Sequence, residues 1–200
     1  MEKKTYKHVY QFKVYLKKIK PIIWRRIEVP ENYTFWGLHC AIQDAMGWLD
    51  YHLHEFEVKD PRIKQKFLFG IPMGEYEMEM SPSWEEKIAN FFTMENRKAN
   101  YLYDLGDFWE HIVRLDEIHP AQKDTQYPRC VSGKRAAPPE DCGGISGYEQ
   151  MIEILLEPQH EEYDSYVKWL GEVYDPEEFN PSKIIFSDPA QRLDNLFNIN

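Results

Sequence analysis

The chain of 200 residues is 42% hydrophobic and 29% charged, a composition typical of a globular protein with one sizeable core or at most two small ones. Its 34 acidic residues outnumber its 24 lysines and arginines, and the resulting net charge of −10 opposes binding to a phosphate backbone. No stretch approaches the roughly 18 to 20 apolar residues that a membrane span needs, and the N-terminus lacks the form of a secretory signal.

The cysteine count and the absence of a linker predict the compartment and the domain organisation. Three cysteines are an odd number, which favours reduced thiols and a cytoplasmic protein over a disulfide framework. No internal repeat or low-complexity segment divides the chain. We therefore expect one domain over residues 1–200, with a core at about 6–156 and a helical C-terminal extension at 157–200.

The first quarter of the chain predicts a β-hairpin followed by a helix. Residues 8–18 and 22–29 alternate apolar and polar side chains, which is typical of strands, and Pro30 ends the second one. Thr34 is placed to cap a helix whose apolar residues recur at three- and four-residue spacing. Gly47 is placed to end that helix in the left-handed conformation.

The middle of the chain predicts more strands and one further helix. Residues 52–58 alternate again, and residues 67–71 favour a short strand. Ser83 and Glu86 match a capping box, so we expect a helix to about Met94. Residues 99–103 and 109–117 read as a second hairpin around a turn at 104–108.

A long loop at 127–148 is the least regular part of the sequence. It holds three prolines, four glycines and two cysteines, so we expect neither helix nor strand in it; a long ordered loop is often functional. Helices are expected at 147–156 and 161–171, and only short pieces beyond. The fold class expected is therefore α+β, with a largely antiparallel sheet, an N-terminal hairpin followed by a helix, a second hairpin and C-terminal helices.

Five segments in a fixed order carry a family likeness. They are Ile-Ile-Trp-Arg-Arg-Ile-Glu-Val-Pro (22–30), Phe-Trp-Gly-Leu-His-Cys-Ala-Ile-Gln-Asp-Ala-Met-Gly-Trp (35–48), His-Leu-His-Glu-Phe (52–56), Tyr-Asp-Leu-Gly-Asp-Phe-Trp-Glu-His (103–111) and Pro-Pro-Glu-Asp-Cys-Gly-Gly (138–144). The series resembles the family named after the third open reading frame of an Ri-type plasmid, whose members are labelled as plasmid-borne or as resolvase-like passengers of insertion elements. The resemblance implies a mobile-element association and no defined chemistry. The spaced arginines and nucleophile that strand transfer would need are not found in this sequence.

A zinc site is one chemical possibility. His52 and His54 are two residues apart on a predicted strand and so project from one face. Imidazole and thiolate groups together suit tetrahedral zinc, and the candidate ligands are His52, His54, His111, Cys130 and Cys142. The wide spacing of the cysteines favours small buried core residues over zinc ligands, and His52 or His54 would then be a core or hairpin residue.

Acid–base chemistry and recognition are the other two possibilities. Carboxylates at Asp104, Asp107, Glu140 and Asp141 could converge with His111, although the turn around Asp104 and Asp107 favours ordinary turn chemistry. Aromatic and arginine side chains are enriched at binding hot spots, and the candidates for binding are Arg25, Trp48, Tyr51, Trp109 and Arg135. Core packing would account for many of the rings.

The leading hypothesis is a cytoplasmic binding or interaction module without catalytic turnover, whose partner is a protein or a small ligand. The alternative is a metal-dependent hydrolase or nuclease that uses a cluster of His52, His54, Asp107 and His111. A third hypothesis, nucleic-acid binding through the lysine-rich first hairpin, is disfavoured by the net charge, and a membrane partner is not expected.

Overall fold

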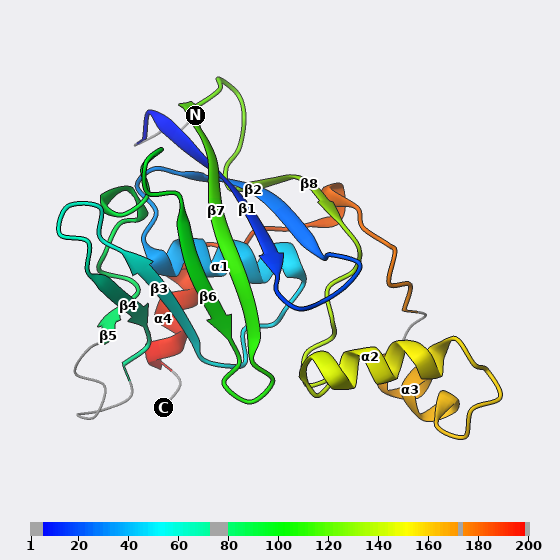
Figure 1. Cartoon of the computed structure of the whole chain (residues 1–200). Coiled ribbons are helices and arrows are strands. Elements are labelled where there is room, and N and C mark those ends of the chain that lie inside the picture. Colours follow the sequence, from blue (N-terminus) through cyan, green and yellow to red (C-terminus); the bar gives the residue numbers. More distant parts are fainter. Residues whose placement is uncertain (1–5, 73–79, 172–173, 199–200) are drawn as a thin grey trace.

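A single eight-stranded sheet forms the frame of the protein in a computed structural model that describes residues 6–72, 80–171 and 174–198 (Figure 1). The strand order is β5-β4-β3-β6-β7-β1-β2-β8, and neighbours run antiparallel except β4 and β5. The strands are β1 (His8–Leu16), β2 (Trp24–Pro30), β3 (His54–Lys59), β4 (Lys66–Gly70), β5 (Met80–Pro82), β6 (Lys98–Tyr103), β7 (Trp109–Pro120) and β8 (Arg129–Lys134). This confirms the expected α+β class with a largely antiparallel sheet.

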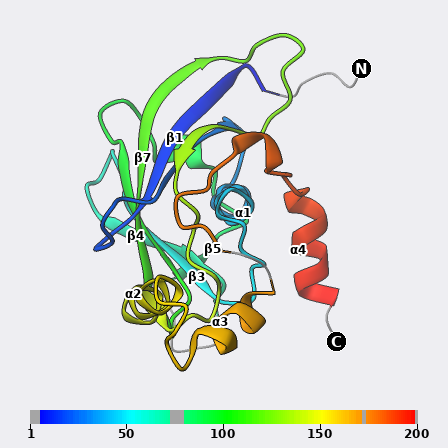
Figure 2. The same cartoon turned by 90° about the vertical axis from the view of Figure 1, so that its right-hand side faces the viewer.

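Four α-helices complete the fold: α1 (Phe35–Met46), α2 (Gly144–Leu155), α3 (Tyr163–Leu170) and α4 (Pro189–Asn198). Helix α1 lies across one face of the sheet, and Figure 2 shows it end-on between the sheet and α4. Helices α2 and α3 pack together beyond one end of the strands (Figure 1). No helix among the described residues is long and apolar enough to cross a bilayer.

The first hairpin and α1 form as their local patterns predict. In β1, the alternating residues Tyr10, Phe12, Val14 and Leu16 are buried in the core that α1 also lines. Thr34 caps α1 by accepting a hydrogen bond from the amide of Gly37, and Gly47 ends it at φ 81°. Because eleven of the twelve residues of α1 are buried, the helix is covered on both the sheet side and the α4 side.

The prediction of a helix from Ser83 to Met94 is wrong. The backbone there bonds to other elements: Trp36 and Phe35 donate to the carbonyls of Ser83 and Glu86, and Ile88 donates to the carbonyl of Tyr33. Only a short 3₁₀ turn, Ile88–Asn90, remains. The segment is used to hold the start of α1, so its local capping signal is overridden by tertiary hydrogen bonds.

The expectation of a strandless loop at 127–148 and of only short pieces after 171 also needs correction. Strand β8 lies inside that loop, because its backbone pairs with the free edge of β2 from Glu28 to Trp24. Near the C-terminus, α4 extends over ten residues and begins at Pro189, a residue that is favourable in the first turn of a helix. Strand β3 also starts at His54, so His52 lies in the preceding loop.

The N-cap of α1 gives a direct test of this local account. We expect Thr34→Ala to lower the free energy of unfolding by about 1 kcal/mol, because the amide of Gly37 loses its acceptor. Urea denaturation measures the change. Thr34→Ser, which keeps the oxygen, should retain most of the stability, and equal losses in both variants would contradict the capping role.

Candidate functional site

Three loops meet at one end of the sheet: residues 47–53 between α1 and β3, residues 104–108 between β6 and β7, and residues 138–144 before α2. We call this region the three-loop end. The indole of Trp48 donates to the carbonyl of Pro138 at 2.8 Å, and the amide of Leu49 donates to Glu140 Oε2 at 2.8 Å. The hydroxyl of Tyr103 donates to the other oxygen of Glu140. Four of the five segments that carry the family likeness therefore reach one place.

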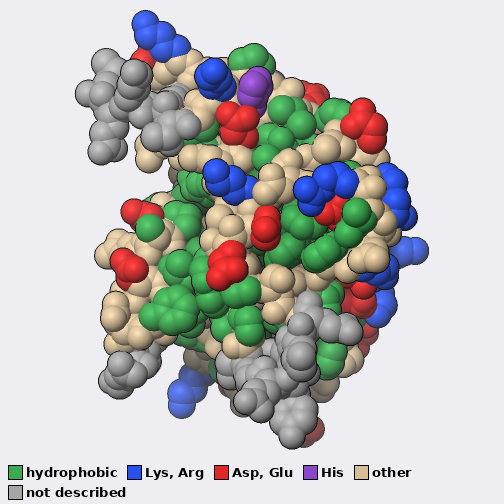
Figure 3. Space-filling model, turned by 90° about the vertical axis from the view of Figure 1, so that its left-hand side faces the viewer, with side chains coloured by type: hydrophobic (Ala, Val, Ile, Leu, Met, Phe, Trp, Pro, Cys, Tyr) green, Lys and Arg blue, Asp and Glu red, His purple; other side chains and the backbone are tan. Residues whose placement is uncertain are grey.

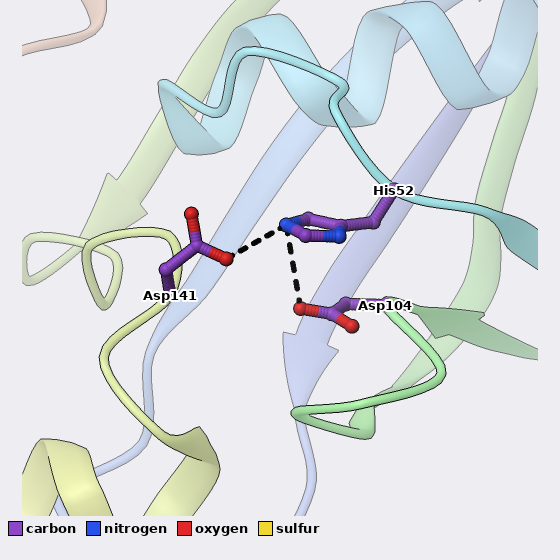
Figure 4. Close-up of side chains that lie close together, drawn as sticks. All are labelled: His52, Asp104 and Asp141. Atoms are coloured by element: carbon purple, nitrogen blue, oxygen red, sulfur yellow. Dashed lines mark ion pairs between the residues drawn. The ribbon is translucent and has the colours of Figure 1, made fainter.

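At the centre of the three-loop end, His52 faces two carboxylates, one from each neighbouring loop (Figure 4). Its Nε2 lies 2.9 Å from Asp141 Oδ1 and 3.6 Å from Asp104 Oδ2. The three side chains differ in exposure, since Asp104 is buried, His52 is partly buried and Asp141 is 63% exposed. A pocket of about 490 Å³ opens onto them and is also lined by Tyr51 and Leu105.

The β6–β7 turn fixes the orientation of Asp104. Its Oδ1 accepts hydrogen bonds from the amides of Gly106 at 2.7 Å and Asp107 at 3.2 Å, which is the aspartate turn chemistry expected here. These bonds use one carboxylate oxygen only. The other, Oδ2, is thereby directed toward His52.

The loop at 138–144 is held onto that turn by a second contact. Asp107 Oδ2 accepts a hydrogen bond from the amide of Gly143 at 3.1 Å. Gly144 has φ 67°, and a Cβ there would lie 2.7 Å from the carbonyl oxygen of Asp107. Only glycine permits both this conformation and this close approach, so Gly144 is required for the loop to dock.

The other two candidate histidines do not join His52. His54 Nε2 lies 3.2 Å from the hydroxyl of Ser83, and the ring stacks on His39 at 3.6 Å. His111 is fully buried between Trp48 and Tyr101. Burial, with a contribution from His39, holds the pKa of His54 well below its usual value, and burial lowers that of His111 to about 4. Both rings are therefore neutral core groups near pH 7.

The two candidate cysteines are also separate from this centre. Cys130 lies on β8, with its thiol directed to the carbonyl of Ser132. The thiol of Cys142 is directed to the carbonyl of Gly144. Burial, reinforced by the Asp107 carboxylate, raises the pKa of Cys142 to about 12, so its thiol is protonated and weakly reactive at neutral pH.

Of the candidate acid–base residues, the four carboxylates of Asp104, Asp107, Glu140 and Asp141 reach the three-loop end, but His111 is buried in the core. Asp107 and Glu140 accept hydrogen bonds that hold the loops together. Asp104 and Asp141 face the imidazole of His52. The structure thus brings the four carboxylates to one region without forming the expected carboxylate–His111 cleft.

Among the candidate binding residues, only Tyr51 lies on the surface, at 71% exposed. Trp48 and Trp109 are buried, although each flanks a turn. Arg25 donates to the carbonyls of Ala45, Trp24 and Lys134, and Arg135 donates to the carbonyl of Pro21. These arginines satisfy backbone carbonyl groups inside the protein, which explains their burial.

Two exposed apolar residues at the three-loop end, Leu49 and Leu105, escaped the sequence reasoning. Leu49, Leu105 and Phe108 are all exposed, and each adjoins a turn or lies within one. The signal available in the sequence was the pair of large apolar residues inside the Asp104–Phe108 turn, where polar residues and glycine are usual.

Three basic residues of the first hairpin are paired with carboxylates of β7. Lys17 and Lys18 pair with Glu110, and Arg26 pairs with Asp116. On the face shown in Figure 3, acidic and basic side chains are interspersed among hydrophobic ones. Neither observation favours a continuous basic surface for nucleic acid.

Known proteins are similar to this chain in sequence and in fold. The family model described as plasmid pRiA4b ORF-3-like protein matches residues 8–183. The chain belongs to this family. A relative from Sinorhizobium fredii, "Uncharacterized protein y4hQ", is 33% identical over 191 residues, which cover 94% of this chain and 92% of the relative.

A solved structure gives the same fold. The crystal structure of "Protein of Unknown Function MM3350" from Methanosarcina mazei Go1 is 47% identical, has a TM-score of 0.85, and corresponds to 91% of this chain and 100% of its own. These relatives of the pRiA4b ORF-3-like family are of unknown function, so the three-loop end must be interpreted from its own chemistry.

The burial of His111 predicts a pH dependence of stability. Its pKa is about 4 when folded and about 6.5 when unfolded, so the unfolded chain binds the proton first as the pH falls. The His111 contribution is intact above pH 6.5 and is lost between 6.5 and 4, by roughly 3 kcal/mol in all. As the pH falls over this range, the free energy of unfolding should decrease less steeply in His111→Phe than in the wild type. Parallel curves for the two proteins would contradict the burial of a neutral His111.

Proposed function

We propose that the protein is an interaction module whose three-loop end binds a positively charged polypeptide segment that carries apolar side chains. The observation that supports this most is a set of four exposed large apolar residues on two of the three loops, of which Tyr51 and Leu105 line the pocket beside His52. They are Leu49 at 64% exposed, Tyr51 at 71%, Leu105 at 47% and Phe108 at 56%. We call these four residues the apolar rim. Large exposed apolar groups gathered in one region are typical of interaction sites.

The charge of the three loops favours a cationic partner. Residues 47–53, 104–108 and 138–144 contain the five carboxylates of Asp50, Asp104, Asp107, Glu140 and Asp141, and no lysine or arginine. Asp50 is already paired with Arg192 of α4, which leaves four carboxylates for a cationic partner. A partner with lysine or arginine beside apolar residues would complement both features. Such complementarity gives specificity and a faster association rate.

Backbone conformation adds a second line of support. Phe108 has φ 53°, a region that a bulky residue adopts at a cost. An exposed aromatic side chain on a strained backbone contributes little to the stability of the fold. Asp50, Asp104 and Asp141, at the same end, have φ between 58° and 64°, and such strained positions concentrate at functional sites.

The metal-dependent enzyme built on His52, His54, Asp107 and His111 has less support. His54 and His111 are buried among other partners, and Asp107 binds the amide of Gly143. Those four side chains do not form one open cluster. Binding, not turnover by that cluster, is the function we propose.

A double variant of the apolar rim tests this function. Leu105→Ser with Phe108→Asn should bind a short fluorescein-labelled peptide of alternating lysine and leucine at least tenfold more weakly, about 1.4 kcal/mol, as measured by fluorescence anisotropy. Asparagine tolerates positive φ, so the variant should keep its stability. The wild-type affinity should fall as salt rises.

The matched control is Ile63→Ser with Met94→Ser, which removes two exposed apolar residues that lie outside the three loops and should bind as the wild type does. Equal affinity of the rim variant and the wild type would exclude the proposal. So would equally strong binding of a peptide in which glutamate replaces lysine.

A further inference from the structure

We propose that His52, Asp104 and Asp141 bind a divalent first-row transition-metal ion, of which Zn²⁺ and Mn²⁺ are the best matches. The proposal stands on the geometry of these three side chains and does not depend on the partner proposed above. One ligand atom of each residue lies within 4.8 Å of the others. They come from three separate loops, which only the fold brings together (Figure 4).

The distances suit a shared ion. Bonds from zinc to imidazole nitrogen or carboxylate oxygen are about 2.0 to 2.2 Å, so two atoms on one ion lie no more than roughly 4.4 Å apart. The separations of His52 Nε2 from Asp141 Oδ1, 2.9 Å, and from Asp104 Oδ2, 3.6 Å, both satisfy this limit. Small side-chain rotations would complete the coordination.

The nitrogen at the centre is not satisfied by a hydrogen bond. His52 Nε2 is buried and has no hydrogen-bond partner among the described residues, although an oxygen lies 2.9 Å away. A neutral imidazole could in any case donate its Nε2 proton to only one of the two carboxylates. A cation placed among the three groups would satisfy the nitrogen lone pair and both negative charges together.

Asp104 provides an independent indication. Its side chain is only 8% exposed, and a buried carboxylate is costly unless it is paired. Oδ1 receives the two turn amides, but Oδ2 accepts no hydrogen bond from the parts of the chain that the structure describes. The free oxygen of a buried carboxylate is thus directed at the same point as His52 Nε2.

The neighbouring contacts hold this arrangement in place without the ion. Glu140 links Tyr103 and the amide of Leu49, and Asp107 binds the amide of Gly143. These bonds fix the backbone on both sides of Asp141. Residues outside the ligand set that orient ligands in this way raise metal affinity.

The donor set selects the class of ion. One imidazole nitrogen with two carboxylate oxygens suits Zn²⁺ and Mn²⁺, whereas Ca²⁺ and Mg²⁺ prefer oxygen ligands alone. Asp141 is largely exposed and the pocket is open. The remaining coordination positions would therefore face solvent and could accept water or a group from a bound partner.

Isothermal titration calorimetry of the full chain with ZnCl₂ and with MnCl₂ tests the site. We expect one saturable site per chain for at least one of the two ions, and at least tenfold weaker binding in both Asp141→Asn and His52→Gln. Asp124→Asn is the matched control, because Asp124 is also exposed and has φ 61°. It should bind as the wild type does.

Two outcomes would overturn the site: no saturable binding of either ion, or unchanged affinity in both ligand variants.

Two further measurements separate this proposal from the partner surface. The Leu105→Ser, Phe108→Asn variant should retain full ion affinity, and its loss of the ion would also count against the assigned ligands. Peptide binding of the wild type with EDTA present then tests the apolar rim without an ion.

Discussion

The docking of residues 138–144 onto the β6–β7 turn and the loop before β3 is the interaction on which the site depends. Trp48, Glu140 and Asp107 each contribute a hydrogen bond to it. Glu140 accepts a hydrogen bond from the hydroxyl of the buried Tyr103. Burial raises the pKa of Tyr103, and the Glu140 carboxylate raises it further. Without this docking, Asp141 would have no fixed relation to His52, and the three-loop end would not exist as a surface.

A second polar network ties the helix layer to the same end of the sheet. His39, buried in α1, makes hydrogen bonds to Tyr101 on β6 and to Asp50 in the first of the three loops. Arg192 of α4 pairs with Asp44 and Asp50 from the other side. The loop that carries Tyr51 and His52 is therefore held through Asp50 by both α1 and α4, and these contacts limit how far the loop can move.

Local signals made part of the fold predictable. The first hairpin and α1 followed from strict alternation, a Thr34 cap and a Gly47 terminator, because these features act within a few residues. The capping signal at Ser83 was misleading, since the backbone there bonds to α1 and not to itself. Strand β8 was hidden because its residues become a strand only by pairing with β2, more than a hundred positions earlier.

The site was only partly predictable for the same reason. His52 and Asp141 were recognisable as chemically capable residues, but sequence spacing could not show that they meet while His54, two positions away, turns into the core. Nor could it show that Arg25 would be buried, because the carbonyls that it satisfies belong to α1 and β8. The sequence shows which residues can carry chemistry, but the partners of those residues are determined by tertiary contacts.

The docking of the 138–144 loop is tested most directly by a double-mutant cycle on Tyr103→Phe and Glu140→Gln. We predict a coupling free energy of about 1 kcal/mol or more from urea denaturation, because the hydroxyl donates to a charged and partly buried carboxylate. Strictly additive effects of the two changes would contradict the docked loop and, with it, the site built on it.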